Sequence, residues 1–264
     1  MADMFADNDS LEIEDLLLLE DFQIGYLPGW VPEREFAAVL HACPTIRAFL
    51  TKKHPPIGGL VERVMSEHAP AESERELSDC CASVVHTIRD MLTYGRCPEV
   101  YDAAEFHKWD FAEITGICPL TDKIVIDAGA GTGRVALEAG GSARWVFAVE
   151  PVTRLRRFMH EKAQAAGLRN VFIIDGFLHA IPLPDHFADM LITSHALAWR
   201  LDDELPEFER VVTPGGFIIH CPGTPDHPSC DEVHEALTSP RWGYRSARYE
   251  LPDGRKRKYW KQLG

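Results

Sequence analysis

The spacing of hydrophobic positions changes about halfway along the chain. Up to Cys118, apolar residues recur mostly every three or four positions, which is the period of an amphipathic helix. The longest such run predicts one helix from Ala71 to Tyr94, ended by Gly95. Its apolar stripe consists of Leu77, Cys81, Val84, Ile88 and Met91.

Proline and glycine divide the rest of this half into further helices. Pro32 opens one helix, Pro44 separates it from a second around 45–52, and the sequence HPPIGG at 54–59 breaks the pattern again. Another helix is expected to start near Asp102, with Glu105 as its capping partner. No strand is expected in this half.

After Cys118, short β-rich runs alternate with helical stretches. A helix is expected across 152–166, ended by Gly167, and another after a capping box formed by Ser229 and Glu232. This alternation predicts parallel βαβ units in an α/β sheet covered on both faces. The expected strands are Ile124–Ala128, Trp145–Glu150, Val171–Ile174, Met190–Thr193 and Phe217–Cys221.

The end of the chain has a different pattern. The segments 244–251 and 256–263 flank Pro252, Asp253 and Gly254, which are typical turn residues. We therefore expect an antiparallel hairpin at the end of the fold.

Composition and charge narrow the class of protein. A hydrophobic fraction of 45% is that of a globular chain, and no apolar run reaches the roughly 18–20 residues that cross a bilayer. The acidic start has no secretory-signal pattern, so a cytoplasmic location and no membrane are expected. A net charge of −14 argues against nucleic acid as a partner. The basic end of the chain is either a solvated hairpin or a docking site for an acidic partner.

Cysteine spacing does not indicate a metal centre. The seven cysteines form no CxxC pair, and their odd number does not indicate a disulfide framework. We expect no metal site and buried thiols instead.

The segment VIDAGAGTGR, Val125–Arg134, carries the main chemical signal. A buried strand runs into a turn with Gly129, Gly131 and Gly133, where the backbone can approach a ligand closely and the next helix offers unpaired N–H groups. Dinucleotide-binding domains use GxGxxG, but here the third position of that pattern is Arg134. The spacing present is GxGxG after an acid, Asp127.

Two further acids follow the next strands. Glu150 ends the second strand, where a carboxylate can accept both hydroxyls of a ribose. Asp175, Gly176 and Phe177 follow the third strand, where a carboxylate can accept from an adenine amino group and an aromatic ring can cover the base.

These residues, with IPLPD at 181–185 and Pro214-Gly215-Gly216, resemble the class I methyltransferases that use S-adenosylmethionine (SAM), in particular the small-molecule group related to ubiquinone and menaquinone biosynthesis. The resemblance covers about 124–221. It implies a doubly wound, Rossmann-like sheet of seven strands with the terminal hairpin, and a SAM cofactor. No (N/D)PP(Y/F) sequence follows the fourth strand, which lowers the expectation of methylation at nucleobase or amide nitrogens.

The resemblance also implies roles for single residues. Glu150 would bind the ribose hydroxyls and Asp175 the adenine amino group, while Ser194 and His195 would line the region between cofactor and substrate. His195 is the candidate catalytic base. The residues expected to bind the cofactor are Asp127, Gly129, Ala130, Gly131, Gly133, Glu150, Pro151, Asp175, Gly176, Phe177 and Ser194.

Simpler explanations for these side chains stay open. Asp127 can cap the loop, Asp175 can cap a following turn, and His195 can satisfy backbone carbonyls. The expected organisation is a helical lid in residues 1–100 and a methyltransferase core in 101–264. The favoured function is transfer of a methyl group to a small molecule. The alternatives are a SAM-binding partner without activity, a macromolecular substrate bound through the basic hairpin, and an NAD-dependent oxidoreductase, which Arg134 disfavours.

Overall fold

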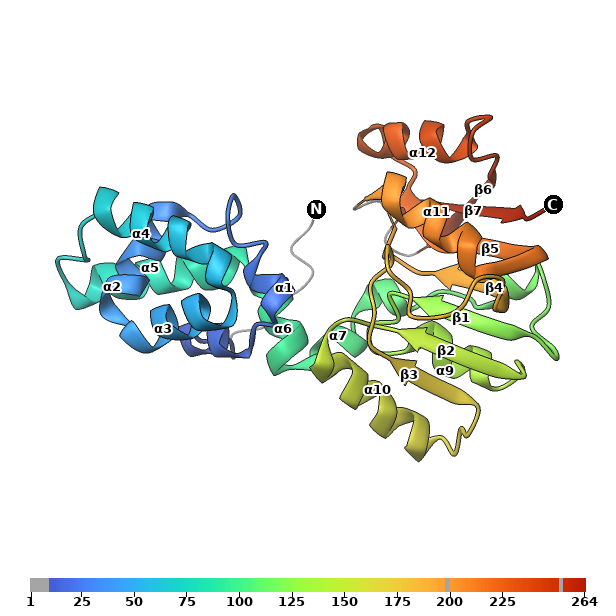
Figure 1. The fold of residues 1–264 in the computed structure, drawn as a ribbon, viewed down its shortest axis with the longest axis horizontal. Coiled ribbons are helices and arrows are strands. Elements are labelled where there is room, and N and C mark those ends of the chain that lie inside the picture. Colours follow the sequence, from blue (N-terminus) through green and yellow to red (C-terminus); the bar gives the residue numbers. More distant parts are fainter. Residues whose placement is uncertain (1–9, 198–199, 252–253) are drawn as a thin grey trace. The chain divides into compact units, whose positions relative to one another are not determined.

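A computed structural model describes residues 10–197, 200–251 and 254–264. The chain divides into two compact units, Met1–Ala103 and Ala104–Gly264, and each has its own hydrophobic core (Figure 1).

The described part of the first unit contains helices and no strand, as the spacing of its apolar residues predicts. Phe36, Leu40, Leu50 and Leu92 are fully buried in its core. Its helices are a 3-10 helix at Ile13–Leu18, α1 (Asp21–Ile24), α2 (Glu33–Ala42), α3 (Pro44–Lys53), a 3-10 helix at Pro55–Ile57, α4 (Gly58–Glu67), α5 (Glu74–Thr87), α6 (Arg89–Arg96) and α7 (Pro98–Asp102).

The prediction of one helix from Ala71 to Tyr94, ended by Gly95, is wrong in its start, its continuity and its end, since α6 runs past Gly95 to Arg96. The helix begins only at Glu74, because the side chain of Ser73 accepts from the backbone N–H of Glu76 and caps it. It is then interrupted at Ile88, whose backbone leaves the helical region at φ −112° and ψ 20°. Ile88 remains buried, so the apolar stripe continues through a break that its spacing does not reveal.

The helix expected to start near Asp102 is also wrong. Asp102 ends α7, which begins at Pro98, where the fixed φ of proline suits the first turn of a helix. The chain then forms a single 3-10 turn at Glu105–His107 and a short helix α8, Ala112–Thr115.

The second unit is built on one sheet of seven strands in the order β3-β2-β1-β4-β5-β7-β6. The first five strands are parallel, while β7 is antiparallel to β5 and to β6. This is the predicted doubly wound, Rossmann-like sheet with a terminal antiparallel hairpin, and the fold class is confirmed. The strands are β1 (Ile124–Ala128), β2 (Trp145–Val149), β3 (Val171–Ile174), β4 (Ala188–Thr193), β5 (Val212–Pro225), β6 (Arg245–Leu251) and β7 (Gly254–Gln262).

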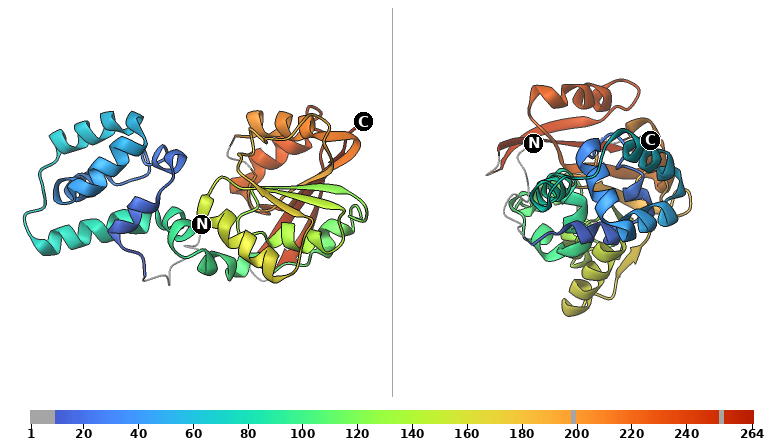
Figure 2. Two further views of the ribbon diagram at one scale, coloured as in Figure 1. Left: turned by 60° about the horizontal axis from the view of Figure 1, so that its bottom comes forward. Right: turned by 90° about the vertical axis from the view of Figure 1, so that its left-hand side faces the viewer.

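Helices cover the two faces of this sheet (Figure 2). Helices α9 (Arg134–Gly140) and α10 (Thr153–Ala165) lie on one face, and α11 (Leu201–Val211) and α12 (Asp231–Thr238) lie toward the other. Because β2 and β4 flank β1 on opposite sides, the strand order reverses between β1 and β4. In open α/β sheets, ligands bind at such a reversal, outside the carboxyl ends of the strands.

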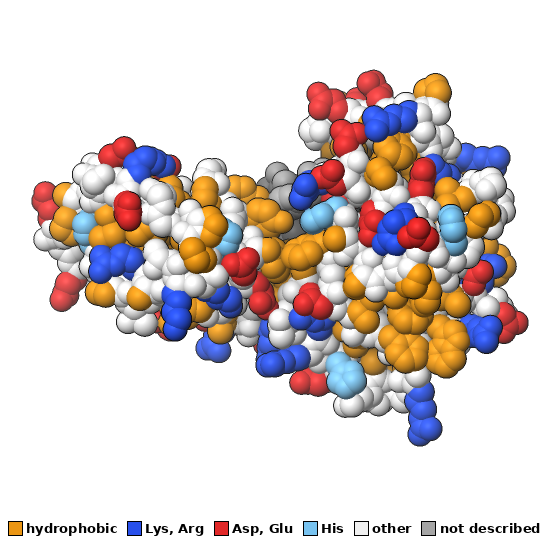
Figure 3. All heavy atoms as spheres, viewed as in Figure 1, with side chains coloured by type: hydrophobic (Ala, Val, Ile, Leu, Met, Phe, Trp, Pro, Cys, Tyr) orange, Lys and Arg blue, Asp and Glu red, His pale blue; other side chains and the backbone are white. Residues whose placement is uncertain are grey.

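The connection from β3 to β4 differs from the others because residues 175–187 contain no helix. A salt bridge and hydrogen bonds tie this connection to α11 instead: Arg210 donates to the carbonyls of Ile181 and Leu183 and pairs with Asp185, and Glu207 accepts from the N–H of Ile181. Aromatic rings on β2 and β3 are left partly exposed beside it, with Trp145 at 38% and Phe172 at 40% (Figure 3).

The C-terminal hairpin is confirmed, although Pro252 and Asp253 of its predicted turn lie outside the described residues. The capping box predicted for Ser229 and Glu232 is wrong. Ser229 lies in a 3-10 turn at Pro228–Cys230, where the ring of His227 accepts from its backbone N–H, and α12 starts after that turn. Within the described segments, no helix combines the length and the apolar character needed to span a bilayer.

Candidate functional site

The sequence-predicted site residues gather at one edge of the sheet. Each group follows the carboxyl end of a parallel strand: the glycine loop 129–133 follows β1, Glu150 and Pro151 follow β2, 175–177 follow β3, and 194–195 follow β4. Since β3, β2, β1 and β4 are neighbours in the sheet, the four groups form a continuous rim at the place where the strand order reverses.

The glycine loop requires glycine for its backbone and for its packing. Gly129, Gly131 and Gly133 have φ of 74°, 55° and 87°, in the left-handed region that side chains disfavour. A Cβ atom on Gly129 would lie 2.6 Å from the Cβ of Ala196 after β4. The loop therefore lies against the segment that follows Ser194 and His195.

Glu150 is connected directly to this loop. Its carboxylate is 5% exposed, and it accepts from the backbone N–H of Gly131 and of Val152, both at 2.9 Å. An ionised carboxylate offers about four acceptor positions, so two remain for further donors. Burial raises the pKa of Glu150 to about 7, which means that the carboxylate lacks the solvation it would have in water.

Asp127 is the second-last residue of β1, just before the glycine loop, and is 1% exposed. Its carboxylate accepts from the backbone N–H of Ala136, in the first turn of α9, at 2.9 Å. This contact is the capping role that the sequence left open beside ligand binding. Burial raises the pKa of Asp127 to about 7, and the nearby carboxylate of Glu150 raises it further.

These pKa values predict how stability depends on pH. A carboxyl group whose pKa is higher in the folded than in the unfolded state favours folding below its unfolded pKa, near 4. That contribution is lost as the pH rises through about 7. Asp127→Asn keeps an acceptor for the N–H of Ala136 but cannot ionise. The unfolded carboxyl is already ionised at pH 5, while the buried one ionises only near pH 7. We therefore expect the stability of this variant relative to the wild type to rise between pH 5 and pH 8, by about 2 kcal/mol or more.

Urea unfolding of the two proteins at pH 5 and pH 8 measures this difference. Asp122→Asn, which removes an exposed carboxylate, is the control. A relative stability of Asp127→Asn that does not rise between pH 5 and pH 8 would contradict a raised pKa.

Asp175 and Glu150 are linked through Arg156, a residue that the sequence analysis missed. Nη1 of Arg156 donates to the carbonyls of Glu150 and Pro151, both at 2.7 Å, and to Oδ1 of Asp175 at 2.9 Å. The Asp175 side chain is 69% exposed, and the described connection 175–187 contains turns but no helix, so capping of the turn at 178–179 stays open beside ligand binding. The only sign of Arg156 in the sequence is an arginine six residues after Glu150, the acid that ends the second strand.

Gly176 and Phe177 continue this part of the rim. A Cβ on Gly176 would lie 2.7 Å from Pro182 and 2.9 Å from Val149, so a side chain does not fit there. The ring of Phe177 stacks on His179 with 5.4 Å between ring centroids. The placement of these residues is compatible with an adenine site, and their contact with a cofactor stays a prediction.

His195 is held by contacts in addition to its place after β4. Its backbone has φ 56°, its N–H donates to the carbonyl of Pro222, and its ring Nε2 lies 3.1 Å from the carbonyl of Phe106. A carbonyl only accepts, so Nε2 carries a proton and Nδ1 is the nitrogen that can take one from a substrate. His220 is different: it is fully buried, hydrogen-bonded to Thr193, and its pKa is lowered by burial to about 3.

The glycine loop contains a polar atom that fits an additional ligand. The hydroxyl of Thr132 is buried and has no hydrogen-bond partner among the described residues. Together with the open acceptor positions of Glu150, it shows that the rim has hydrogen-bonding capacity which the described protein atoms do not use. A nucleoside with ribose hydroxyls matches the acceptor part of this set.

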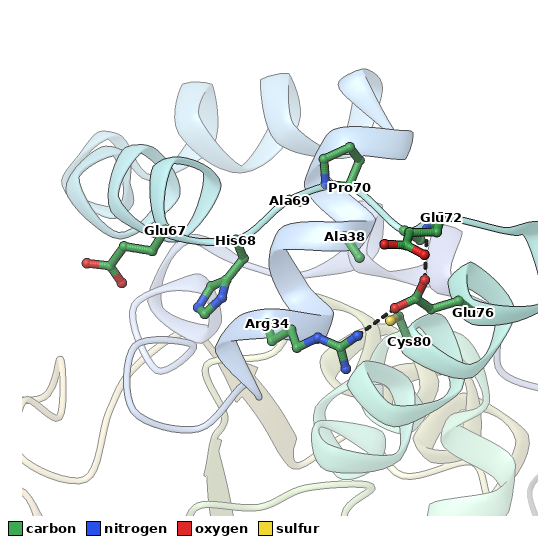
Figure 4. Close-up of a pocket in the computed structure, with 10 residues that line it drawn as sticks. Arg34, Ala38, Glu67, His68, Ala69, Pro70, Glu72, Glu76 and Cys80 are labelled. Atoms are coloured by element: carbon green, nitrogen blue, oxygen red, sulfur yellow. Dashed lines mark hydrogen bonds and ion pairs between the residues drawn. The ribbon is translucent and has the colours of Figure 1, made fainter.

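The first unit contains a separate pocket of about 190 Å³ (Figure 4). Arg34 pairs with Glu76 across it at 2.5 Å, and Glu76 also accepts from the backbone N–H of Glu72. Beside it, Glu33, Glu67 and His68 lie within 4.8 Å of one another, but Arg63 pairs with both glutamates. Both arginines beside this pocket are thus engaged by glutamates, and we assign the pocket no particular chemistry.

Comparison with known proteins points to the same part of the chain. The model of a family described as a methyltransferase domain matches residues 126–220, from β1 into β5. All four groups of the rim fall within this range.

Individual relatives are similar over the same region. Malonyl-[acyl-carrier protein] O-methyltransferases are 26% identical over 132 residues (Marinomonas; 48% of each chain) and 31% identical over 118 residues (Yersinia pestis; 44% of this chain and 42% of the relative). A methyltransferase of Mycobacterium tuberculosis is 28% identical over 131 residues, 48% of this chain and 51% of the relative. The chain thus spans about half the length of the curated relatives it matches.

A solved SAM-dependent methyltransferase from Aquifex aeolicus is also similar. It is 21% identical, with a TM-score of 0.49, over 61% of this chain and 93% of that one.

Proposed function

Because the second unit contains a domain of the class I SAM-dependent methyltransferase family, we propose that this protein transfers a methyl group from SAM to a small-molecule acceptor. The observation that carries the proposal is the rim itself. A left-handed glycine loop, a buried carboxylate with acceptor positions left over and a second acid on the next strand lie side by side at the reversal of the strand order.

Each part of the rim has a proposed task. The loop 129–133 would pack against the methionine and ribose portion of the cofactor, and Glu150 would accept from the ribose hydroxyls. Asp175, oriented by Arg156, would accept from the adenine amino group, with Gly176 and Phe177 alongside. Asp127, Ala130, Pro151 and Ser194 complete the proposed cofactor contacts.

Methyl transfer from SAM requires few catalytic groups from the protein. SAM supplies a methyl group already activated by its sulfonium. The protein must therefore align the nucleophile with the methyl carbon and exclude water, and orientation of this kind can contribute roughly 7–11 kcal/mol. A base is needed only where the nucleophile must lose a proton. His195 follows β4 at the edge of the rim, and we propose Nδ1 of its ring as the acceptor of that proton.

A methyl-transfer assay tests the proposal directly. The protein is incubated with methyl-labelled SAM and an unfractionated metabolite extract, and S-adenosylhomocysteine (SAH) and labelled products are followed. SAH formation that depends on the extract supports the proposal. Tight binding of SAM without any SAH formation would instead support the alternative, a SAM-binding partner without activity.

The basic hairpin gives little support to a macromolecular acceptor. Arg248 and Arg257 pair with Asp226, Lys258 with Glu113, and Lys261 with Glu209. These cations are therefore largely neutralised by the protein's own acids. The names of two relatives specify a malonyl group carried on an acyl-carrier protein. They describe those proteins, and here they support only that the group that receives the methyl is small.

The role of His195 can be separated from its structural contacts. If His195 is the base, His195→Ala should lower kcat by about 10²-fold or more, and the pH profile should lose its acidic limb. His195→Asn tolerates the left-handed backbone and keeps a hydrogen-bond donor but lacks basicity. Activity restored in the asparagine variant would show that His195 positions the loop and takes no proton.

A further inference from the structure

A short segment before β1 is held from two sides of the rim. We call this segment, residues 105–109, the strap. It contains the 3-10 turn Glu105–His107 and the buried ring of Trp109. Arg134 holds one end of it. Nε of Arg134 donates to the carbonyl of His107 at 3.1 Å, and Nη2 donates to the carbonyl of Trp109 at 2.8 Å. The guanidinium also lies over the Trp109 ring, 5.1 Å from its centroid.

His195 holds the other end. Its ring Nε2 binds the carbonyl of Phe106, and the two rings meet edge to face with 5.1 Å between their centroids. Because the backbone N–H of His195 is itself bound to the carbonyl of Pro222, the ring has a fixed support on β5. Three carbonyls of the strap are thus bound by two side chains of the rim.

The positions of the two anchors determine where the strap lies. Arg134 is the first residue of α9, directly after the glycine loop that follows β1, and His195 follows β4. The strand order reverses between β1 and β4, so a segment bound to both anchors lies over the edge of the sheet where ligands of such folds bind.

One group in the strap gains a hydrogen bond when the strap opens. The Nε1–H of Trp109 is buried without an acceptor among the described residues, and such a group gains a hydrogen bond when it reaches water. Burial of the Trp109 ring in the core favours the closed position, and the contacts of Arg134 and His195 add to it. Arg134 is suited to this task because its planar fork can bind two carbonyls at once, which a lysine cannot do.

We propose that Arg134 and His195 are positioning residues that hold the strap closed over the crevice, and that a bound cofactor product leaves when the strap is released. This inference rests on the proposed function for the identity of the ligand. The anchoring itself does not depend on it and is measured separately.

Trypsin reports on the strap without any ligand. Lys108 lies in the strap with its side chain 62% exposed, and cleavage after it requires the backbone of the strap to open. The rate of cleavage after Lys108 is measured by mass spectrometry and divided by the rate after the exposed Arg169, between α10 and β3. We expect this ratio to rise about tenfold or more in Arg134→Gln and by less in Arg134→Lys. It should stay unchanged in Arg154→Gln, an exposed arginine of α10.

The dissociation of SAH reports on release. In Arg134→Gln, stopped-flow measurements should show SAH leaving about tenfold faster, with the association rate nearly unchanged. An unchanged cleavage ratio would overturn the anchoring. Faster cleavage at both Lys108 and Arg169 would also overturn it, because that result means global unfolding. An unchanged dissociation rate would overturn the release step. Wild-type protein that fails to bind SAH would refute the proposed function, while the cleavage ratio would still decide the anchoring.

Discussion

Replacing Gly131 with leucine will abolish SAH binding, with an expected loss in affinity of more than 100-fold. Gly131 stands in the middle of the glycine loop with φ 55°, and its N–H donates to the buried carboxylate of Glu150. A leucine side chain at this position would occupy the space that the ligand needs. It would also strain the left-handed backbone by about 1–2 kcal/mol and so disturb the contact with Glu150.

Gly167→Leu separates these two effects. Gly167 also has a positive φ, 67°, but a Cβ built on it meets nothing within 4 Å, and it lies at the end of α10, away from the rim. Gly167→Leu therefore carries the backbone strain alone, and only Gly131→Leu should lose SAH in calorimetry. Equal affinities in the two variants would place the ligand somewhere other than the glycine loop.

SAH binding will release protons near neutral pH, and Glu150 will be their source. The carboxyl group is buried, with a pKa of about 7, so it is about half protonated in the free protein at pH 7. Ribose hydroxyls that donate to the ionised form would lower this pKa, and about half a proton would leave for each ligand bound. Affinity should consequently fall as the pH is lowered below 7, by up to tenfold per unit.

Calorimetry in buffers of different ionisation enthalpy counts the protons released. Glu150→Gln should bind SAH at least tenfold more weakly and release no proton, because its side chain does not titrate. Asp175→Asn, which alters the neighbouring acid of the rim, should weaken binding but keep the release. Proton release that survives in Glu150→Gln would assign the titrating group to another residue, with Asp127 the first to examine.

The parallel strands were largely predictable because each is a short apolar run between turn residues. β1 and β3 begin and end where such runs do, although only β1 is mostly buried. The break at Ile88 was not predictable. The same apolar stripe serves one helix or two when the residue at the break stays in the core.

The candidate site was also predictable only in part. Glycines and acids at strand ends are visible in the sequence because a turn and a ligand both require those residue types. Arg134 and Arg156 were missed because most of their partners are backbone carbonyls, which every residue has, and those of Arg134 lie 25 and 27 positions away. At Arg134 the sequence excluded the dinucleotide pattern but gave no sign of what the side chain does. The lid role of residues 1–100 and the cytoplasmic location stay predictions.

Because no helix connects β3 and β4, the stability of this connection against local unfolding depends on α11. Residues 175–187 have no hydrogen-bonded ladder of their own, and their middle is fastened to Glu207 and Arg210 of α11. We therefore expect residues 181–185 to exchange their amide hydrogens together with α11. When α11 frays, this stretch should be released in the same event, while the glycine loop and Glu150, which follow β1 and β2, stay in place.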